Sequence, residues 1–279
     1  MRPSGNNLPK RTLEPISSHT DIRDFSAFCS ADRPLAAGNP CRLHLLASEP
    51  GSAPPPADRA QCATWPRAAA CAEVRCWTAT GQLIQCCGHG LLSAAAGWRE
   101  TWPAAGKLLM NGSTIPCEFD GEDIWLGFSR IDTETCAVPD WVASLFGSLP
   151  TAAAQAGDEN GYMVLAWPAD SELGELASPG ADLSSRTMRA VIATCAVTPE
   201  AARFGESIRY RYFAPQHGVD EDSATGSAMR ILATYWEACG LGSALCAWQQ
   251  SPRGGWLRSR ITSGRIWVGG RVSEAVAGA

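Results

Sequence analysis

One local pattern occurs twice in this 279-residue chain, about half a chain length apart, and it constrains the fold more than any other feature. Each time, strand-like segments lead into a turn of small residues, and that turn opens an apolar helix. The first turn is CGHG at 87–90 and the second is TGSA at 225–228. A unit repeated in this way predicts two similar domains that face one another.

The segments around these turns carry ordinary strand and helix signals. Residues 106–131 indicate three strands separated by Asn111-Gly112 and Asp120-Gly121, a pattern typical of β-hairpins. The apolar helix after the second turn should end at Gly240. The predicted fold class is therefore α/β, more closely α+β. We expect a loose N-terminal tail over 1–20, a first domain over 21–133 and a second domain over 134–279, whose last strand can return to the first domain.

The composition excludes several classes of function. The net charge is -5 and no basic stripe is present, so nucleic acid is a poor partner. No apolar stretch reaches the roughly 18 residues of a membrane helix, and the polar N-terminus lacks a secretory signal. These features predict a cytoplasmic protein that does not bind membranes. The 12 cysteines lie mostly in apolar contexts, which favours reduced core residues.

The two turns have a chemistry of their own. The first turn of a helix leaves backbone N–H groups without partners, and together with the helix dipole they attract an anion. Gly88 and Gly90 would let a ligand approach the backbone closely. The same field would lower the pKa of the Cys87 thiol, and His89 with Asp222 could donate or accept protons. Two facing helix starts of this kind suggest proton transfer on a small carboxylic acid.

Two other readings of the first turn are weaker. A zinc site made of Cys86, Cys87 and His89 would have poor tetrahedral geometry, and no second ligand pair is present. The CGHG sequence also lacks the Gly-x-Gly-x-x-Gly pattern of a dinucleotide site. We therefore expect no metal or other cofactor. Cys86 alternates with Cys87 and is expected to point to the opposite face as a packing residue.

Plain structural roles remain open for the same residues. Cys87 could be a small buried residue, and His89 could cap a helix or sit in the core. Asp222, Thr225 and Ser227 are all good helix caps.

Four segments of the chain carry a family resemblance, namely 24–46, 74–96, 210–232 and 249–272. In this order they resemble the PhzF family, which includes the isomerase of phenazine biosynthesis. The most specific piece is Glu221-Asp222 followed by ATGSA at 224–228, and CGH at 87–89 is second. The resemblance implies the diaminopimelate epimerase fold: two similar domains, each a curved sheet around a central helix, with the site in the cleft between them. It also implies cofactor-independent proton shifts, racemisation or related eliminations on small carboxylic acids, and a homodimer.

The resemblance assigns roles residue by residue. His89 matches the family's active-site histidine and Asp222 matches the aspartate of its second motif. Gly88 at the first helix start, and Gly226 and Ser227 at the second, match the contacts to the substrate carboxylate.

Diaminopimelate epimerases, which are distant relatives, carry their two catalytic cysteines where this chain has Cys87 and Thr225. The symmetric pair of cysteines is therefore absent, and Thr225 is expected among the substrate-binding residues. A lyase or dehydratase that uses Cys87 as base, with Thr225 opposite it, is an alternative to isomerisation.

The catalytic glutamate of PhzF isomerases has no counterpart in the sequence. Its motif aligns near 66–68, and the nearest glutamate, Glu73, lies beside the following strand. Cys87, His89 or Asp222 could take over its work, or the chain could be a small-ligand-binding homologue that has lost catalysis. The leading prediction is a biosynthetic isomerase or epimerase acting on a small, cyclic or unsaturated, amino or hydroxy acid.

Overall fold

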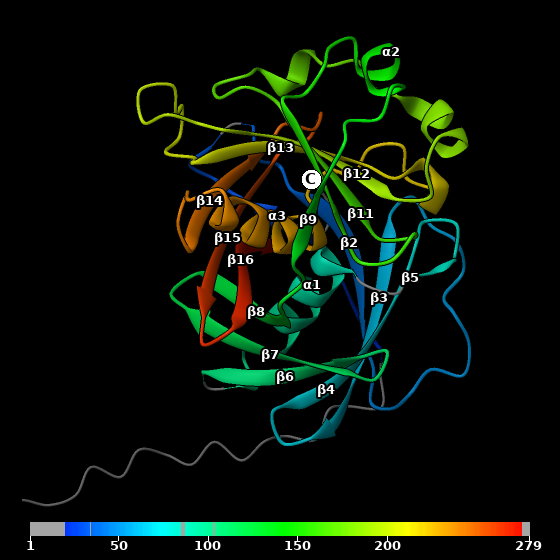
Figure 1. Cartoon of the computed structure of the whole chain (residues 1–279). Coiled ribbons are helices and arrows are strands. Elements are labelled where there is room, and N and C mark those ends of the chain that lie inside the picture. The colour runs from blue at the N-terminus through cyan, green and yellow to red at the C-terminus, as the bar shows by residue number, and fades with distance from the viewer. Residues whose placement is uncertain (1–19, 34, 85–86, 103, 275–279) are drawn as a thin grey trace, which may run out of the picture.

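The computed structural model describes residues 20–33, 35–84, 87–102 and 104–274 (Figure 1). In these ranges the strands join into one continuous, mostly antiparallel sheet that bends around two central helices. The first half supplies β1 (Asp21–Cys29), β2 (Asn39–Leu45), β3 (Ala60–Ala68), β4 (Cys71–Trp77), β5 (Leu83–Ile84), β6 (Ala105–Met110), β7 (Ser113–Asp120) and β8 (Asp123–Ser129).

The second half supplies the remaining strands. They are β9 (Thr133–Cys136), β10 (Ala152–Ala156), β11 (Tyr162–Ala166), β12 (Ala190–Ala196), β13 (Ile208–Phe213), β14 (Ala244–Gln249), β15 (Gly255–Thr262) and β16 (Arg265–Glu274). A short helix, α2 (Val142–Phe146), and the turns η1 (Leu173–Glu175), η2 (Gly180–Ser185) and η3 (Pro215–His217) connect them.

The first half closes into a barrel. Its strands pair in the order β1-β2-β3-β4-β6-β7-β8-β16, and β16 also pairs with β1, which completes the ring. Helix α1 (Gly88–Trp98) packs against β1, β2, β3 and β8. Its Leu91, Leu92, Ala94 and Ala95 are fully buried, because almost every face of the helix meets a strand.

The second half repeats the first. From β1 to β8, leaving out β5, successive pairings are antiparallel, parallel, antiparallel, parallel, antiparallel and antiparallel. From β10 to β16 the sequence of orientations is the same. Helix α3 (Gly226–Ala238) lies in the position of α1 and packs against β9, β14, β15 and β16. The predicted fold of two similar units, each a curved sheet around a central helix, is confirmed.

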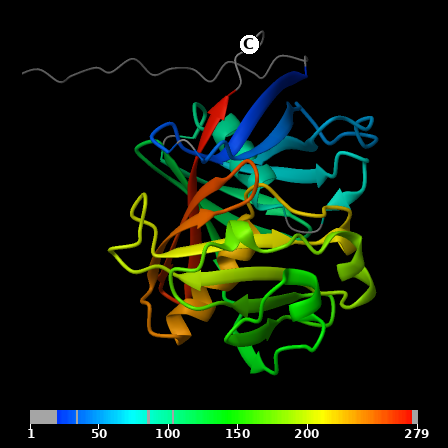
Figure 2. The ribbon, with the colours of Figure 1, turned by 90° about the horizontal axis from the view of Figure 1, so that it is seen from above.

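The two halves share strand β16, which runs alongside both of them in Figure 2. Strand β9 crosses the predicted boundary at residues 133 and 134 and pairs with β10. The domain limits themselves stay a prediction.

Local signals set several of the bounds. Asn111 and Gly112 both have positive φ (49° and 75°), which is the backbone of the tight turn that joins β6 to β7. Gly240, with φ of 85°, follows the end of α3 as expected.

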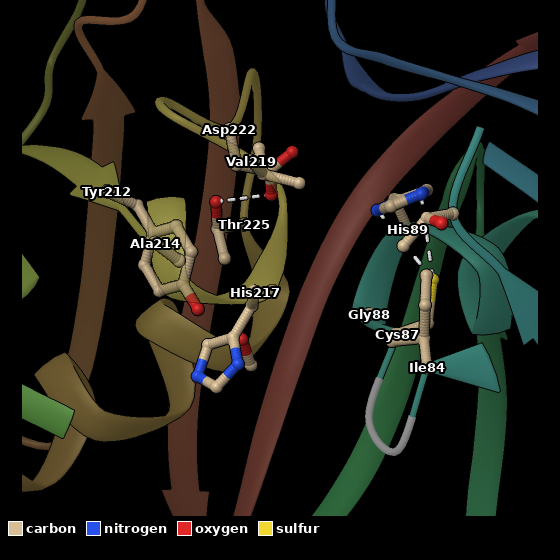
Figure 3. Close-up of a pocket in the computed structure, with 13 residues that line it drawn as sticks. Ile84, Cys87, Gly88, His89, Tyr212, Ala214, His217, Val219, Asp222 and Thr225 are labelled. Atoms are coloured by element: carbon tan, nitrogen blue, oxygen red, sulfur yellow. Dashed lines mark hydrogen bonds between the residues drawn. The ribbon is translucent and has the colours of Figure 1, made fainter. Parts of the chain in front are cut away.

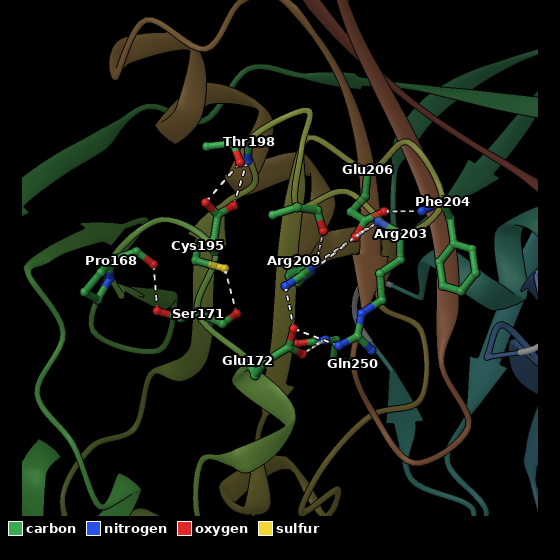
Figure 4. Close-up of polar contacts among 12 residues, drawn as sticks. Pro168, Ser171, Glu172, Cys195, Thr198, Arg203, Phe204, Glu206, Arg209 and Gln250 are labelled. Atoms are coloured by element: carbon green, nitrogen blue, oxygen red, sulfur yellow. Dashed lines mark hydrogen bonds and ion pairs between the residues drawn. The ribbon is translucent and has the colours of Figure 1, made fainter.

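A buried ionic cluster ties the loops of the second half to β13 (Figure 4). Arg209 donates to Glu206 at 3.1 Å and to Glu172 at 2.9 Å, and the side chains of Arg209 and Glu206 are at most 1% exposed. Breaking one partner out of such a pair costs about 3–5 kcal/mol, because a buried charge is left uncompensated. The cluster therefore fixes the beginning of β13, the strand that continues at its other end, Phe213, into the loop of residues 214–225.

Every cysteine within the described ranges is free. No helix there is long and apolar enough to cross a membrane.

Candidate active site

Helices α1 and α3 begin in direct backbone contact with each other. A Cβ added to Gly88 would lie 2.8 Å from the Cα of Gly226, which no side chain could tolerate. The residues before these glycines, Cys87 and Thr225, make no side-chain hydrogen bond to their helix. The first N–H groups of both helices therefore remain uncapped by these side chains and can meet an anion.

A chamber of about 120 Å³ lies at this meeting point. In Figure 3, Asp222, Thr225 and His217 are on one side of it and His89 and Cys87 on the other. All the predicted site residues except Gly90 line this chamber. The lining is Thr78, Ile84, Cys87, Gly88, His89, Tyr212, Ala214, His217, Val219, Asp222, Thr225, Gly226 and Ser227.

The carboxylate of Asp222 is fixed by several hydrogen bonds. Its Oδ2 accepts from the Thr225 hydroxyl at 2.6 Å, and its Oδ1 accepts from the Asn39 amide at 2.7 Å and the Ser223 N–H at 3.0 Å. Gln249 donates to the Asp222 carbonyl and accepts from the Thr225 N–H. None of the hydrogen bonds to this carboxylate comes from the first turn of α3. Asp222 therefore lines the chamber and does not cap the helix.

Asn39 lies between Asp222 and His89. Its amide nitrogen donates to Asp222 at 2.7 Å and to the Ala224 carbonyl at 3.0 Å, which uses both of its hydrogens. The same nitrogen lies 3.2 Å from Nδ1 of His89, which can therefore keep a proton of its own. Burial lowers the pKa of His89, but Cys87 and the Asp222 carboxylate oppose this and raise it to about 9. At neutral pH the imidazole is a proton donor.

Cys87 departs from its predicted chemistry. Its sulfur lies 3.6 Å from Nε2 of His89, but it is only 3% exposed and belongs to the main core. A hydrogen bond to Cys76 and burial raise the pKa of the Cys87 thiol well above its usual range. The expectation of a lowered pKa is wrong, because the hydrogen bond with Cys76 and the burial of the sulfur among core atoms both favour the neutral thiol.

Gly90 also departs from its predicted role. A Cβ there would lie 2.5 Å from the sulfur of Cys76 and 2.8 Å from that of Cys87, so the missing side chain makes room for packed thiols. It does not open the helix start to a ligand. Cys86 lies outside the described residues.

The pair expected for a lyase, Cys87 and Thr225, does not offer a base. The thiol keeps its proton at neutral pH, and the Thr225 hydroxyl donates to Asp222. Thr225 serves to hold the aspartate.

No glutamate lines the chamber within the described ranges. Residues 66–68, where the family motif aligns, end β3 on the surface, and Arg67 there donates to Glu73 at 2.6 Å. Both side chains are therefore engaged outside the chamber.

Two residues that sequence reasoning missed are central to the arrangement. Asn39 stands at the start of β2 in the Gly-Asn-Pro turn, and His217 ends η3, five residues before Asp222. The His217 ring lines the chamber, and its side chain takes part in none of the described hydrogen bonds. Both lie inside segments that carry the family resemblance, which was the only available signal.

Glu221, the other half of the acidic motif, anchors the loop that carries His217 and Asp222. Arg211 donates to both of its carboxylate oxygens, at 2.8 and 2.7 Å, and donates to the carbonyls of Leu173 and Leu176. The Arg211 and Glu221 side chains are 7% and 11% exposed. Such a two-pronged pair fixes orientation as well as distance.

The fold defines a class: it is a mixed α+β fold similar to that of solved PhzF-family and epimerase structures. A solved PhzF-family phenazine biosynthesis protein from Enterococcus faecalis has a TM-score of 0.76 with this chain at 20% identity, covering 92% of this chain and 99% of its own. A hydroxyproline epimerase from Agrobacterium vitis, solved with trans-4-hydroxy-L-proline, has a TM-score of 0.57 at 10% identity, covering 94% and 92%.

The particular family follows from sequence. The family model PhzC-PhzF, described as phenazine biosynthesis-like protein, matches residues 128–275, and the chain belongs to this family. A curated relative, Uncharacterized isomerase PA2770 of Pseudomonas aeruginosa, is 29% identical over 199 residues, which are 70% of this chain and 73% of that protein. Relatives named isomerases thus support an isomerase-type enzyme.

Proposed function

We propose that the protein is an isomerase or epimerase that moves a proton within a small, cyclic or unsaturated, amino or hydroxy acid, using only its own side chains, as a step of a biosynthetic pathway. The observation that carries this proposal is the contact between Gly88 and Gly226, which aims two uncapped helix starts into a chamber flanked by His89 and Asp222. The cyclic hydroxy acid held by the hydroxyproline epimerase supports the choice of acid.

The helix starts would bind the substrate carboxylate. Removing a proton from the carbon beside a carboxylate places additional negative charge on the carboxylate oxygens. N–H groups and helix dipoles already aimed at these oxygens stabilise this charge without reorganising. Ser227, whose hydroxyl makes none of the described hydrogen bonds, lines the chamber at the start of α3 and can donate to the same carboxylate.

The proton transfer needs one group that accepts and one that donates. His89, with a pKa raised to about 9, is protonated at neutral pH and is therefore the donor. His217, on the opposite side of the chamber, would accept the substrate proton on a ring nitrogen. The electron pair of the broken C–H bond moves into the conjugated carboxylate, and His89 then protonates the opposite face or a different carbon. The product is an epimer or an isomer of equal composition.

In this scheme Asp222 acts through position and charge. It holds Asn39 against His89, and its charge favours the protonated imidazole. His217 replaces the proton shuttle that a glutamate supplies in PhzF isomerases. The homodimer implied by the family resemblance stays a prediction.

Solvent deuterium incorporation tests the proposal. Candidate acids, starting with trans-4-hydroxy-L-proline, would be incubated in D₂O and followed by NMR and mass. His89→Gln and His217→Gln should each slow exchange about 10²- to 10⁴-fold, the usual range for a lost acid or base. His44→Gln, a histidine outside the chamber, is the matched control. Undiminished exchange in both site variants would refute the assignment, and saturable binding with no exchange at any pH would favour a non-catalytic binding protein.

A further inference from the structure

A second, larger chamber adjoins the first. It has a volume of about 590 Å³, against about 120 Å³ for the chamber at the helix starts. The two share a wall made of Thr78, Ile84, Tyr212, His217 and Ser227. The inner chamber has room for a carboxylate and the carbon beside it, whereas the outer volume lies within the range of complete ligand pockets.

The charge in the outer chamber is opposite in sign to that at the helix starts. Among the described residues that line it, Asp158 is the one carboxylate, and no lysine or arginine is present. Asp158 lies in the turn between β10 and β11, where its Oδ1 accepts from the Asn160 N–H at 3.0 Å. No described ion pair uses it, and its Oδ2 makes none of the described hydrogen bonds.

The rest of the outer lining suits an organic cation. Tyr162 and Tyr212 contribute aromatic rings, and Gln82 and Gln216 contribute amide groups. Aromatic faces and a carboxylate both favour an ammonium or guanidinium group. A substrate that spans both chambers would have its carboxylate at the helix starts and a positive group near Asp158.

We infer that the substrate is an extended zwitterionic acid, in which the reacting carbon and carboxylate occupy the inner chamber and a distal amino or guanidino group occupies the outer chamber beside Asp158. This inference rests on the proposed function for the identity of the inner group. It assigns the outer chamber as a specificity site that selects substrates by the charge of their far end.

Binding measurements with two matched probes test this without turnover. L-Lysine and L-norleucine share a chain of the same carbon count and differ by the terminal ammonium group. Titration calorimetry should show L-lysine binding about 5-fold more tightly, a size expected for one partly exposed charge pair with an aromatic contribution. The preference should shrink as salt is added.

Two variants locate the effect. Asp158→Asn should bring the preference to about 2-fold or less, while Glu159→Gln, which removes the adjacent carboxylate outside the lining, should leave it unchanged. Equal affinity for both probes, tighter binding of L-norleucine, no saturable binding of either, or an unchanged preference in Asp158→Asn would each overturn the inference. His89→Gln should lose deuterium exchange yet keep the preference, so a failure of the proposed chemistry and a failure of the specificity site give different results.

Discussion

The two helix starts have the same backbone and different surroundings. At α1, Cys87 lies among core thiols, and the pKa of its thiol is raised well above its usual range. At α3, Thr225 lies in a polar network with Asp222 and Gln249. Neither residue caps its helix. The two halves thus share an uncapped helix start, while the side chains beside it differ.

The two sides of the site therefore differ in what they contribute. The α3 side is rigid, because Asp222 is held by three hydrogen bonds and its loop by the Arg211–Glu221 pair. The α1 side carries the titratable group, His89, whose pKa is raised first by Cys87 beside it and then by the Asp222 carboxylate on the α3 side. A site built from two similar halves need not be chemically symmetric.

The largest expected effect concerns the charge of His89. Its pKa is raised to about 9 in the folded protein from 6.5, so protonation stabilises the fold. This contribution, up to about 3 kcal/mol, is fully present below pH 6.5 and is lost as the pH rises through about 9. Urea unfolding of wild type and His89→Gln from pH 6 to pH 10 should show a stability difference that shrinks over this window. An equal difference at both ends would contradict the raised pKa, and His44→Gln serves as control.

The contact between the two helix starts should be nearly as sensitive. In Gly88→Ala the new Cβ would lie 2.8 Å from backbone that cannot rotate away, so the helices must separate. The expected cost is about 1–3 kcal/mol, with a fall in melting temperature of about 3–10 °C and weaker binding of carboxylates. Gly174→Ala, where a Cβ would meet nothing within 4 Å, is the control. Calorimetric melting of the two variants checks this, and equal melting temperatures would show that the helix starts do not touch.

The smallest effect is expected at Cys87. Since its thiol keeps its proton at pH 7 and is no base, Cys87→Ala should act only by removing its contribution to the raised pKa of His89. It should change deuterium exchange by less than about 3-fold and cost about 1 kcal/mol in packing. Thr225→Val, the matched change at the other start, removes a hydrogen bond to Asp222 and should slow exchange about 10-fold. A fall of 100-fold or more in Cys87→Ala would instead make the sulfur a catalytic group.

The sequence predicted those features of the fold that depend on the backbone preferences of a few neighbouring residues. The Asn111-Gly112 turn, the end of α3 at Gly240 and the two helix starts follow from backbone preferences that a few neighbouring residues settle. Strand β10, Ala152–Ala156, was not predicted, because alanine by itself favours helix and only pairing with β9 and β11 makes it a strand.

The site was predicted less completely, for a related reason. His89, Asp222 and Ser227 belong to recognisable motifs and do line the chamber. Asn39 reaches His89 only because β2 begins beside the start of α1, and His217 faces the chamber only because Glu221 is anchored to β13. The pKa of Cys87 depends on how many core atoms surround the sulfur, which no local pattern reports.

Strand β16 has a consequence for how the molecule is made. The barrel around α1 closes only when residues 265–274 pair with both β1 and β8, although β8 ends at Ser129. During synthesis on the ribosome, the first half therefore stays an open sheet without β16 until more than a hundred further residues have been added. During that interval the edges of β1 and β8 are unpaired and prone to aggregate, so a chaperone would be expected to bind there.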